Sequence, residues 1–187
     1  GAPAFYRRKP ILSRLRPSKG VWYVSSGLYM GGADKLHRAM SDHEQCDFEE
    51  RIVTEVLAKV PHPVVYKPYP ALRYPDPDPV LAAAREAGLT VHESGMDLRY
   101  EIHKPELLIA SRSGSTIGYC LCQEKPLVYI EAPGRKLRDQ VAEDFEKGVF
   151  LFSAYDPDFF GKMTRFLCLP ISEIKALWAA KREARDR

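Results

Sequence analysis

Short apolar runs rich in β-branched and aromatic residues recur along the chain, and Gly, Pro or polar residues bound each of them. Runs of about four to six such residues are typical of strands that are buried on both faces of a sheet. The pattern therefore predicts six strands, at residues 21–25, 63–68, 89–93, 107–111, 127–131 and 149–153.

The segments between these runs carry apolar residues at helical spacing. Asp47 precedes Glu50 by three residues, which predicts a capping box at the start of a helix that ends before Pro61. The Asp-Pro pair at 78–79 predicts the start of the next helix, and Ser172 is the expected cap of the last one. Further helices are expected around residues 97–104, 115–123 and 136–148 and after the Asp-Pro pair at 156–157.

The alternation of strands and helices indicates the fold class. Parallel strands need long crossover connections, and in α/β proteins these are right-handed and usually helical. We therefore expect an α/β, doubly wound Rossmann-like domain over residues 20–187, with a six-stranded, mostly parallel sheet covered by helices on both faces. The usual strand order, 3-2-1-4-5-6, would place the carboxyl ends of the first and fourth strands side by side.

Small, hydroxyl-bearing and glycine residues follow both of those strands. They are Ser25, Ser26 and Gly27 after the first strand, and Arg112, Ser113, Gly114, Ser115 and Thr116 after the fourth. Short side chains let backbone N–H groups approach an anion, and a helix that begins in the second segment would direct its free N–H groups at it. The two segments therefore predict a phosphate cradle. The alternative is that Ser115 or Thr116 only caps a helix.

Charged residues are expected at the same edge of the sheet. Lys67 ends the second strand and could approach a diphosphate as a point charge, or simply face solvent. Glu131 ends the fifth strand and could accept hydrogen bonds from a ribose, or pair with a helix dipole or with Arg135. Arg112 could pair with a phosphate or with Glu93 or Glu131.

Composition and motifs exclude several classes of protein. The chain has 187 residues, 45% hydrophobic and 28% charged, as is typical of one soluble globular domain. It contains no GxGxxG, GxxxxGK[ST], GxSxG or CxxC pattern, which disfavours nucleotide-dependent oxidoreductases, P-loop NTPases, hydrolases and cysteine-based zinc sites. The histidines lack metal-ligand spacing and both Asp-x-Asp pairs precede helices, so no metal site is expected. Four cysteines without a disulfide pattern favour buried thiols in a reducing cytoplasm.

The charge is unevenly distributed. The net charge is +3, but six Lys and Arg residues lie between positions 7 and 19, and no acid appears before Asp34. Residues 1–19 therefore form a basic arm that could touch an anionic membrane surface, or a solvated linker that leads into the domain. Aromatic and basic residues do not interleave along one face, so nucleic-acid binding is not expected.

The sequence resembles the C-terminal, donor-binding half of GT-B glycosyltransferases, and most closely the bacterial surface-carbohydrate transferases that include capsule and CDP-glycerol-type enzymes. The resemblance runs from about residue 20 to about residue 175 and rests on VWYVSSG (21–27), VVYKPYP (64–70) and LLIASRSGSTIGYCLCQEKPLVYIE (107–131). The basic lead-in FYRRKPILSRLRP is similar to the segment that joins the two halves of such enzymes. Tyr69 stands where many relatives have the His of Lys-Pro-His-Pro, so the role of that His does not carry over.

The resemblance implies a glycosyltransferase that uses a nucleotide-activated sugar in surface polysaccharide biosynthesis, without a tightly bound metal or cofactor. It implies donor contacts from Ser25, Ser26, Gly27, Lys67, Arg112, Ser113, Gly114, Ser115, Thr116 and Glu131. Such enzymes have a second, acceptor-side domain that usually supplies the general base, and 187 residues leave no room for it. We therefore expect a donor half that lacks its N-terminal acceptor domain, in the cytoplasm or at the inner face of the membrane. The alternative is a non-catalytic α/β module whose basic arm binds a membrane surface or a protein partner.

Overall fold

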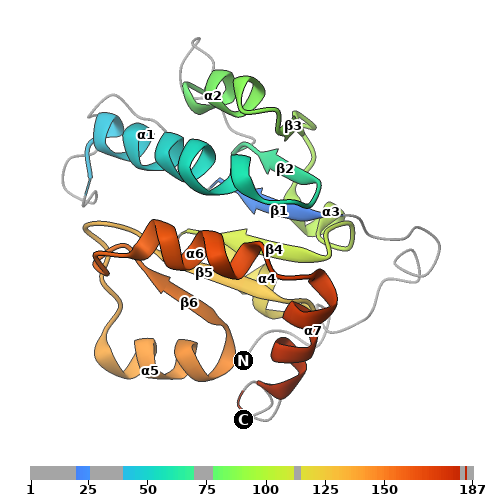
Figure 1. Ribbon diagram of the computed structural model, residues 1–187, viewed down its shortest axis with the longest axis vertical. Coiled ribbons are helices and arrows are strands. Elements are labelled where there is room, and N and C mark those ends of the chain that lie inside the picture. Colours follow the sequence, from blue (N-terminus) through green and yellow to red (C-terminus); the bar gives the residue numbers. More distant parts are fainter. Residues whose placement is uncertain (1–19, 26–39, 70–77, 112–114, 182–183, 185–187) are drawn as a thin grey trace.

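The computed structural model describes residues 20–25, 40–69, 78–111, 115–181 and 184 (Figure 1). Its centre is a six-stranded sheet in the order β3-β2-β1-β4-β5-β6, and every pair of neighbouring strands is parallel. The strands are β1 (Val21–Val24), β2 (Val64–Lys67), β3 (Thr90–Val91), β4 (Leu107–Ala110), β5 (Leu127–Glu131) and β6 (Phe150–Ser153). The predicted Rossmann-like fold, with its strand order, is confirmed.

The helices cover both faces of this sheet. Helices α1 and α6 pack together on one face, where the rings of Phe48 and Phe159 stack with centroids 5.9 Å apart, and α3 and α4 lie on the other (Figure 1). The helices are α1 (Asp42–Arg51), which continues into the π-helical η3 (Ile52–Val56) and the 3-10 helical η4 (Leu57–Lys59), α2 (Val80–Glu86), α3 (Leu98–Glu101), α4 (Ser115–Leu121), α5 (Asp139–Gly148), α6 (Phe159–Leu167) and α7 (Ile171–Ala180).

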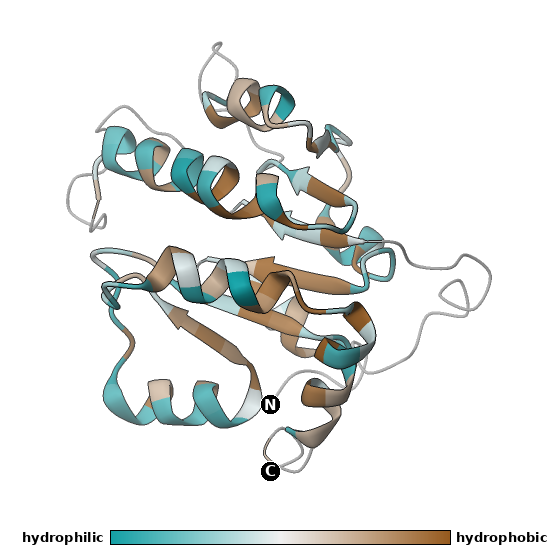
Figure 2. Cartoon of the chain, viewed as in Figure 1, coloured by the Kyte–Doolittle hydropathy of each residue, from teal (hydrophilic) through white to brown (hydrophobic). Residues whose placement is uncertain are grey.

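Burial explains why the strands read as continuous apolar runs. Every residue of β1, β4 and β5 is buried, as a central strand with helices on both faces requires. Figure 2 shows the same division, with hydrophobic residues in the strands and hydrophilic ones on the outer sides of the helices. The core is therefore two apolar layers, one on each side of the sheet.

Three predicted helix starts were wrong. Helix α6 begins after Asp158, not at the Asp156-Pro157 pair that was expected to cap it. Helix α1 begins at Asp42, because Ser41 is its N-cap: the Ser41 hydroxyl accepts a hydrogen bond from the Glu44 N–H (3.2 Å), and the Glu44 carboxylate accepts one from the Ser41 N–H (2.8 Å). Asp47 lies inside the helix. Helix α7 begins at Ile171 after Pro170, so Ser172 is already helical. The capping-box spacing occurs twice before the apolar run, and local sequence does not show which copy begins the helix.

A tight junction holds the amino ends of β1 and β4 together. Gly20 has a φ of 77°, its N–H donates to Glu106 Oε2 (3.3 Å), and its carbonyl accepts from the Glu106 N–H (2.9 Å). The Glu106 carboxylate also binds Lys175 of α7 (2.7 Å), which lowers the pKa of Glu106. A Cβ atom at residue 20 would overlap the carbonyl oxygen of Pro63. Glycine is therefore required here for both its backbone conformation and its size.

We expect Gly20→Ala to lower the free energy of unfolding by at least about 2 kcal/mol, because the new methyl group meets a positive φ and a backbone oxygen. Gly118→Ala is the matched control: it lies in α4 with no atom within 4 Å of the new Cβ, and it should raise stability by about 0.5–1 kcal/mol. Urea unfolding measures both. Effects of the same sign would contradict this account of Gly20.

Candidate functional site

The carboxyl ends of β1 and β4 adjoin at one edge of the sheet. Val24 and Ala110 are partners in the parallel register, so the next residues, Ser25 and Ser111, leave the two strands side by side. Both serines are buried. The two hydroxyl-rich segments therefore start from neighbouring positions, where ligands of doubly wound proteins usually bind.

The predicted loop residues are only partly covered by the structure. Ser26, Gly27, Arg112, Ser113 and Gly114 lie outside the described residues. Helix α4 begins at Ser115, and the half-buried Thr116 is its second residue. The first backbone N–H groups of a helix have no partner within it. The described end of the second loop therefore presents such groups at the carboxyl edge.

The hydroxyl of Ser25 points into the protein. It donates to Glu49 Oε2 (2.8 Å), and Glu49 is a buried residue of α1. The hydroxyl of Tyr66 lies 3.4 Å from the same oxygen and 3.1 Å from Asp78 Oδ2. Burial raises the pKa of Tyr66, and the two carboxylates raise it further, so the phenol remains a donor. Ser25 thus anchors the start of the first loop.

Lys67 forms an ion pair in the interior of the protein. The sequence had suggested either a contact with a diphosphate or a solvent-facing side chain, and neither interpretation anticipated this pairing. Its ammonium lies 2.9 Å from Glu101 Oε2, and only 2% of each side chain is exposed. It also donates to the carbonyl of Met96 (3.1 Å) and lies 3.4 Å from the Ser94 hydroxyl. Alternation along β2 turns Lys67 toward the face that α3 covers. The ammonium group of Lys67 therefore binds groups inside the protein in this structure.

Glu101 is the centre of this network. Besides Lys67 it binds His92 Nε2 (2.7 Å), the Ser94 hydroxyl (2.7 Å) and Lys104 Nζ (2.7 Å). Burial acts to raise the pKa of Glu101, but the hydrogen bonds from these donors outweigh it and hold the pKa well below its ordinary value. The ionised carboxylate thus fastens the segment after β3 to the carboxyl end of β2.

Glu131 shapes the loop that follows β5. Its buried carboxylate accepts hydrogen bonds from the Leu137 N–H at Oε1 (2.6 Å) and from the Ser153 hydroxyl at Oε2. The backbone carbonyl of Glu131 accepts from the Ala154 N–H (2.9 Å). Both carboxylate oxygens have partners within the protein, so Glu131 connects residues 132–138 to the end of β6. A contact with ribose stays a prediction.

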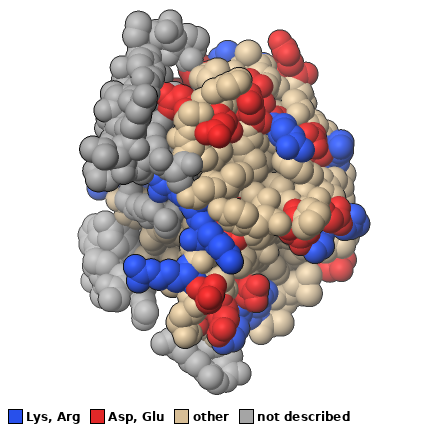
Figure 3. Space-filling model, turned by 90° about the vertical axis from the view of Figure 1, so that its left-hand side faces the viewer, with Lys and Arg blue, Asp and Glu red and all other residues tan. Residues whose placement is uncertain are grey.

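Sequence reasoning missed a basic loop beside this acid. Residues 132–138 contain Arg135, Lys136 and Arg138 and no acidic residue, and they leave the sheet at its carboxyl edge. Figure 3 looks onto this side of the molecule and shows Lys and Arg side chains gathered in its middle, with acids above and below. The signal was present in the sequence as three basic residues within positions 135–138, shortly after the strand that ends at Glu131.

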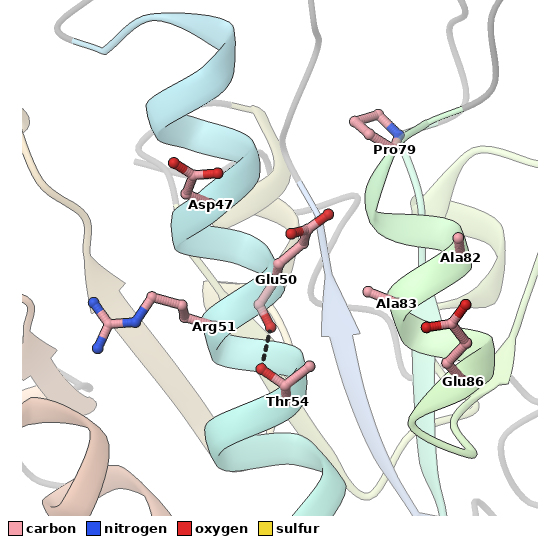
Figure 4. A pocket seen from close by; sticks show the side chains of 8 residues that line it. All are labelled: Asp47, Glu50, Arg51, Thr54, Pro79, Ala82, Ala83 and Glu86. Carbon is pink, nitrogen blue, oxygen red and sulfur yellow. Dashed lines mark hydrogen bonds between the residues drawn. The ribbon is translucent and has the colours of Figure 1, made fainter.

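A separate groove lies between α1 and α2 (Figure 4). Its volume is about 610 Å³ and three of its lining residues are acids; it is lined by Asp47, Glu50, Arg51, Thr54, Pro79, Ala82, Ala83 and Glu86. Arg51, the basic residue of the lining, pairs with Glu55 (2.6 Å). The acidic lining of this groove would repel a phosphate-bearing ligand.

The described residues give no indication of a metal site, since no three His, Cys, Asp or Glu side chains among them are arranged to hold an ion. Within the same part of the chain, no helix combines the length and the apolar composition needed to cross a bilayer. All four cysteines are free thiols, and burial raises the pKa of Cys120 to about 12. The prediction of buried thiols is correct for Cys120, whereas Cys46 and Cys122 are half-buried and Cys168 is exposed.

Comparison with known proteins supports the fold. The sequence matches no protein-family model and no curated protein. The structure is similar to a solved structure of the spinosyn forosaminyltransferase SpnP, with a TM-score of 0.50 and 18% sequence identity. The match covers 96% of this chain and 42% of that chain, so the present chain spans less than half the length of that structure.

We expect Lys67→Met to lower the free energy of unfolding by about 3 kcal/mol or more, because it removes one donor from a buried carboxylate. Lys162→Met is the control: Lys162 pairs with Asp156 at the surface, where an ion pair contributes about 0–1 kcal/mol. Urea denaturation compares the two variants. If Lys67→Met cost no more than the control, the interior role of Lys67 would be refuted.

The network also predicts a pH dependence. Because the folded-state pKa of Glu101 lies below the ordinary 4.5, its contribution to stability is complete above that pH and is lost as pH falls through the folded-state value. Glu101→Gln should therefore destabilise the protein strongly at pH 7 and less at pH 3, where part of this contribution is already lost. Urea midpoints of the wild type and the variant at both pH values measure this. A difference that stays constant with pH would rule it out.

Proposed function

We propose that the chain is the donor-binding half of a glycosyltransferase that transfers a sugar, or a similar unit, from a nucleotide-activated donor in bacterial surface polysaccharide biosynthesis. The observation that carries the proposal is the meeting of β1 and β4 at the carboxyl edge, with the start of α4 and a basic loop beside it. The similarity in fold to a forosaminyltransferase supports sugar transfer.

The chemistry of such a donor fits the electrostatics of the edge. A nucleotide-activated sugar carries phosphate, and its transfer leaves negative charge on the departing nucleotide. Backbone N–H groups at Ser115 and Thr116 can bind that charge, together with the predicted contacts of Ser26, Gly27 and residues 112–114. Fixed donors of this kind stabilise a leaving group without reorganising during the reaction. A bound metal is not needed in this scheme.

The buried polar groups support the loops around the donor. Ser25 fixes the start of the first loop through Glu49, and Lys67 fixes the segment after β3 through Glu101. Glu131 fixes the loop after β5. In this proposal these residues position the site, and the binding contacts come from the backbone and from outward-facing side chains.

The second domain of the enzyme would supply the acceptor site and the general base. The chain spans less than half of the structure that it resembles, which is consistent with an N-terminal acceptor domain outside the present sequence. The reaction would take place in the cytoplasm, and the basic arm of residues 1–19 would hold the protein at the anionic inner face of the membrane.

Titration of the protein with CMP, CDP and UDP by calorimetry tests the proposal. We expect at least one nucleotide to bind well below millimolar concentration, and Ser115→Ala to weaken it by roughly 10-fold, as the loss of a hydrogen bond to a charged group does. Ser172→Ala, an exposed serine near the start of α7, is the control and should leave affinity unchanged. The proposal is lost if no nucleotide binds below millimolar concentration.

A further inference from the structure

Two cations on the loop after β5 have no ion-pair partner within the described part of the chain. Lys136 and Arg138 are exposed, and neither side chain forms an ion pair or a hydrogen bond with any residue in the described ranges. On the neighbouring helix α6, by contrast, Lys162 pairs with Asp156. Opposite charges commonly lie near one another at protein surfaces. Two nearby cations without acidic partners among the residues that the structure describes, beside a candidate site, would be explained by an anion that binds there.

The backbone that presents these two cations is held in place. Leu137 lies between them; its N–H donates to the buried Glu131 carboxylate (2.6 Å), and its side chain packs against the core. Lys136 and Arg138, on either side of Leu137, are both exposed. The buried acid thus holds in place the backbone that carries two exposed cations.

The sheet register places this loop next to the proposed phosphate site. Ala110 of β4 is the partner of Tyr129 of β5, so the buried Ser111 and Ile130 follow at the same level of the sheet. Neighbouring strands lie about 4.8 Å apart. The loop after β5 therefore leaves the sheet beside the loop that leads into α4, on the side away from β1.

We propose that Lys136 and Arg138 form a second anion subsite that takes the second phosphate of a nucleoside diphosphate donor. This inference rests on the proposed function and narrows its substrate class. In the proposed function one phosphate binds beside the carboxyl ends of β1 and β4, so a donor linked through a single phosphate would leave the two cations unused. Arg138 can bind a phosphate through two N–H groups, and Lys136 adds a point charge.

The affinities of CDP and CMP for the full chain and for the Lys136→Gln/Arg138→Gln double variant test the subsite by calorimetry at fixed ionic strength. The wild type should bind CDP at least about 10-fold more tightly than CMP, and the double variant should lose most of this preference while its affinity for CMP stays within about 2-fold. Lys147→Gln, at the other end of α5, is the matched control and should change neither affinity. Both substituted side chains are exposed, so the urea midpoint should not move.

The outcomes separate the subsite from the proposed function. Equal affinities of the wild type for CDP and CMP, or an equal loss of both in the double variant, would overturn the subsite while donor binding stands. Inorganic pyrophosphate is the probe if no nucleotide binds, a result that refutes the proposed function. Pyrophosphate binding that is lost in the double variant would then support the subsite, and no binding of pyrophosphate to the wild type would overturn it.

Discussion

The parallel pairing of β1 with β4 is the constraint on which the candidate site depends. The strand order reverses there, so the connection after β1 leads to α1 on one face of the sheet and the connection after β4 leads to α4 on the other. In doubly wound proteins, ligands commonly bind where two such connections diverge from adjoining strands. Hydrogen bonds between buried backbones fix this geometry, so substitutions in the loops can alter the chemistry of the edge without moving it.

Next to this edge, Ser25, Lys67 and Glu131 bind partners inside the protein. In the proposed function, other groups then make the contacts with the ligand. Glu49 holds Ser25, Glu101 holds Lys67, and Glu131 holds Leu137. A buried carboxylate without such partners would be strongly destabilising, so each acid fixes the segment that supplies its donors. The three acids have one feature in common: each restrains a segment that borders the carboxyl edge.

The distribution of charge distinguishes the carboxyl edge from the groove between α1 and α2. The groove between α1 and α2 has acidic residues on both of its helices, whereas the loop after β5 is basic and lies among the strand ends. A ligand with phosphate groups would be repelled by the first and attracted to the second. Electrostatics and topology therefore favour the same place for an anionic donor.

The sequence by itself determined the strands and their order. Runs of β-branched residues predict the strands, and the helical crossovers between them require parallel pairing, which leaves few possible arrangements of the sheet. It did not determine where α1 begins, since the capping-box spacing that Ser41 uses recurs at Asp47. Only the tertiary structure showed that Lys67 is paired with Glu101, a partner from a helix far along the chain. It alone also showed that Lys136 lacks a partner among the described residues, because whether a charge is neutralised depends on neighbours that folding brings together.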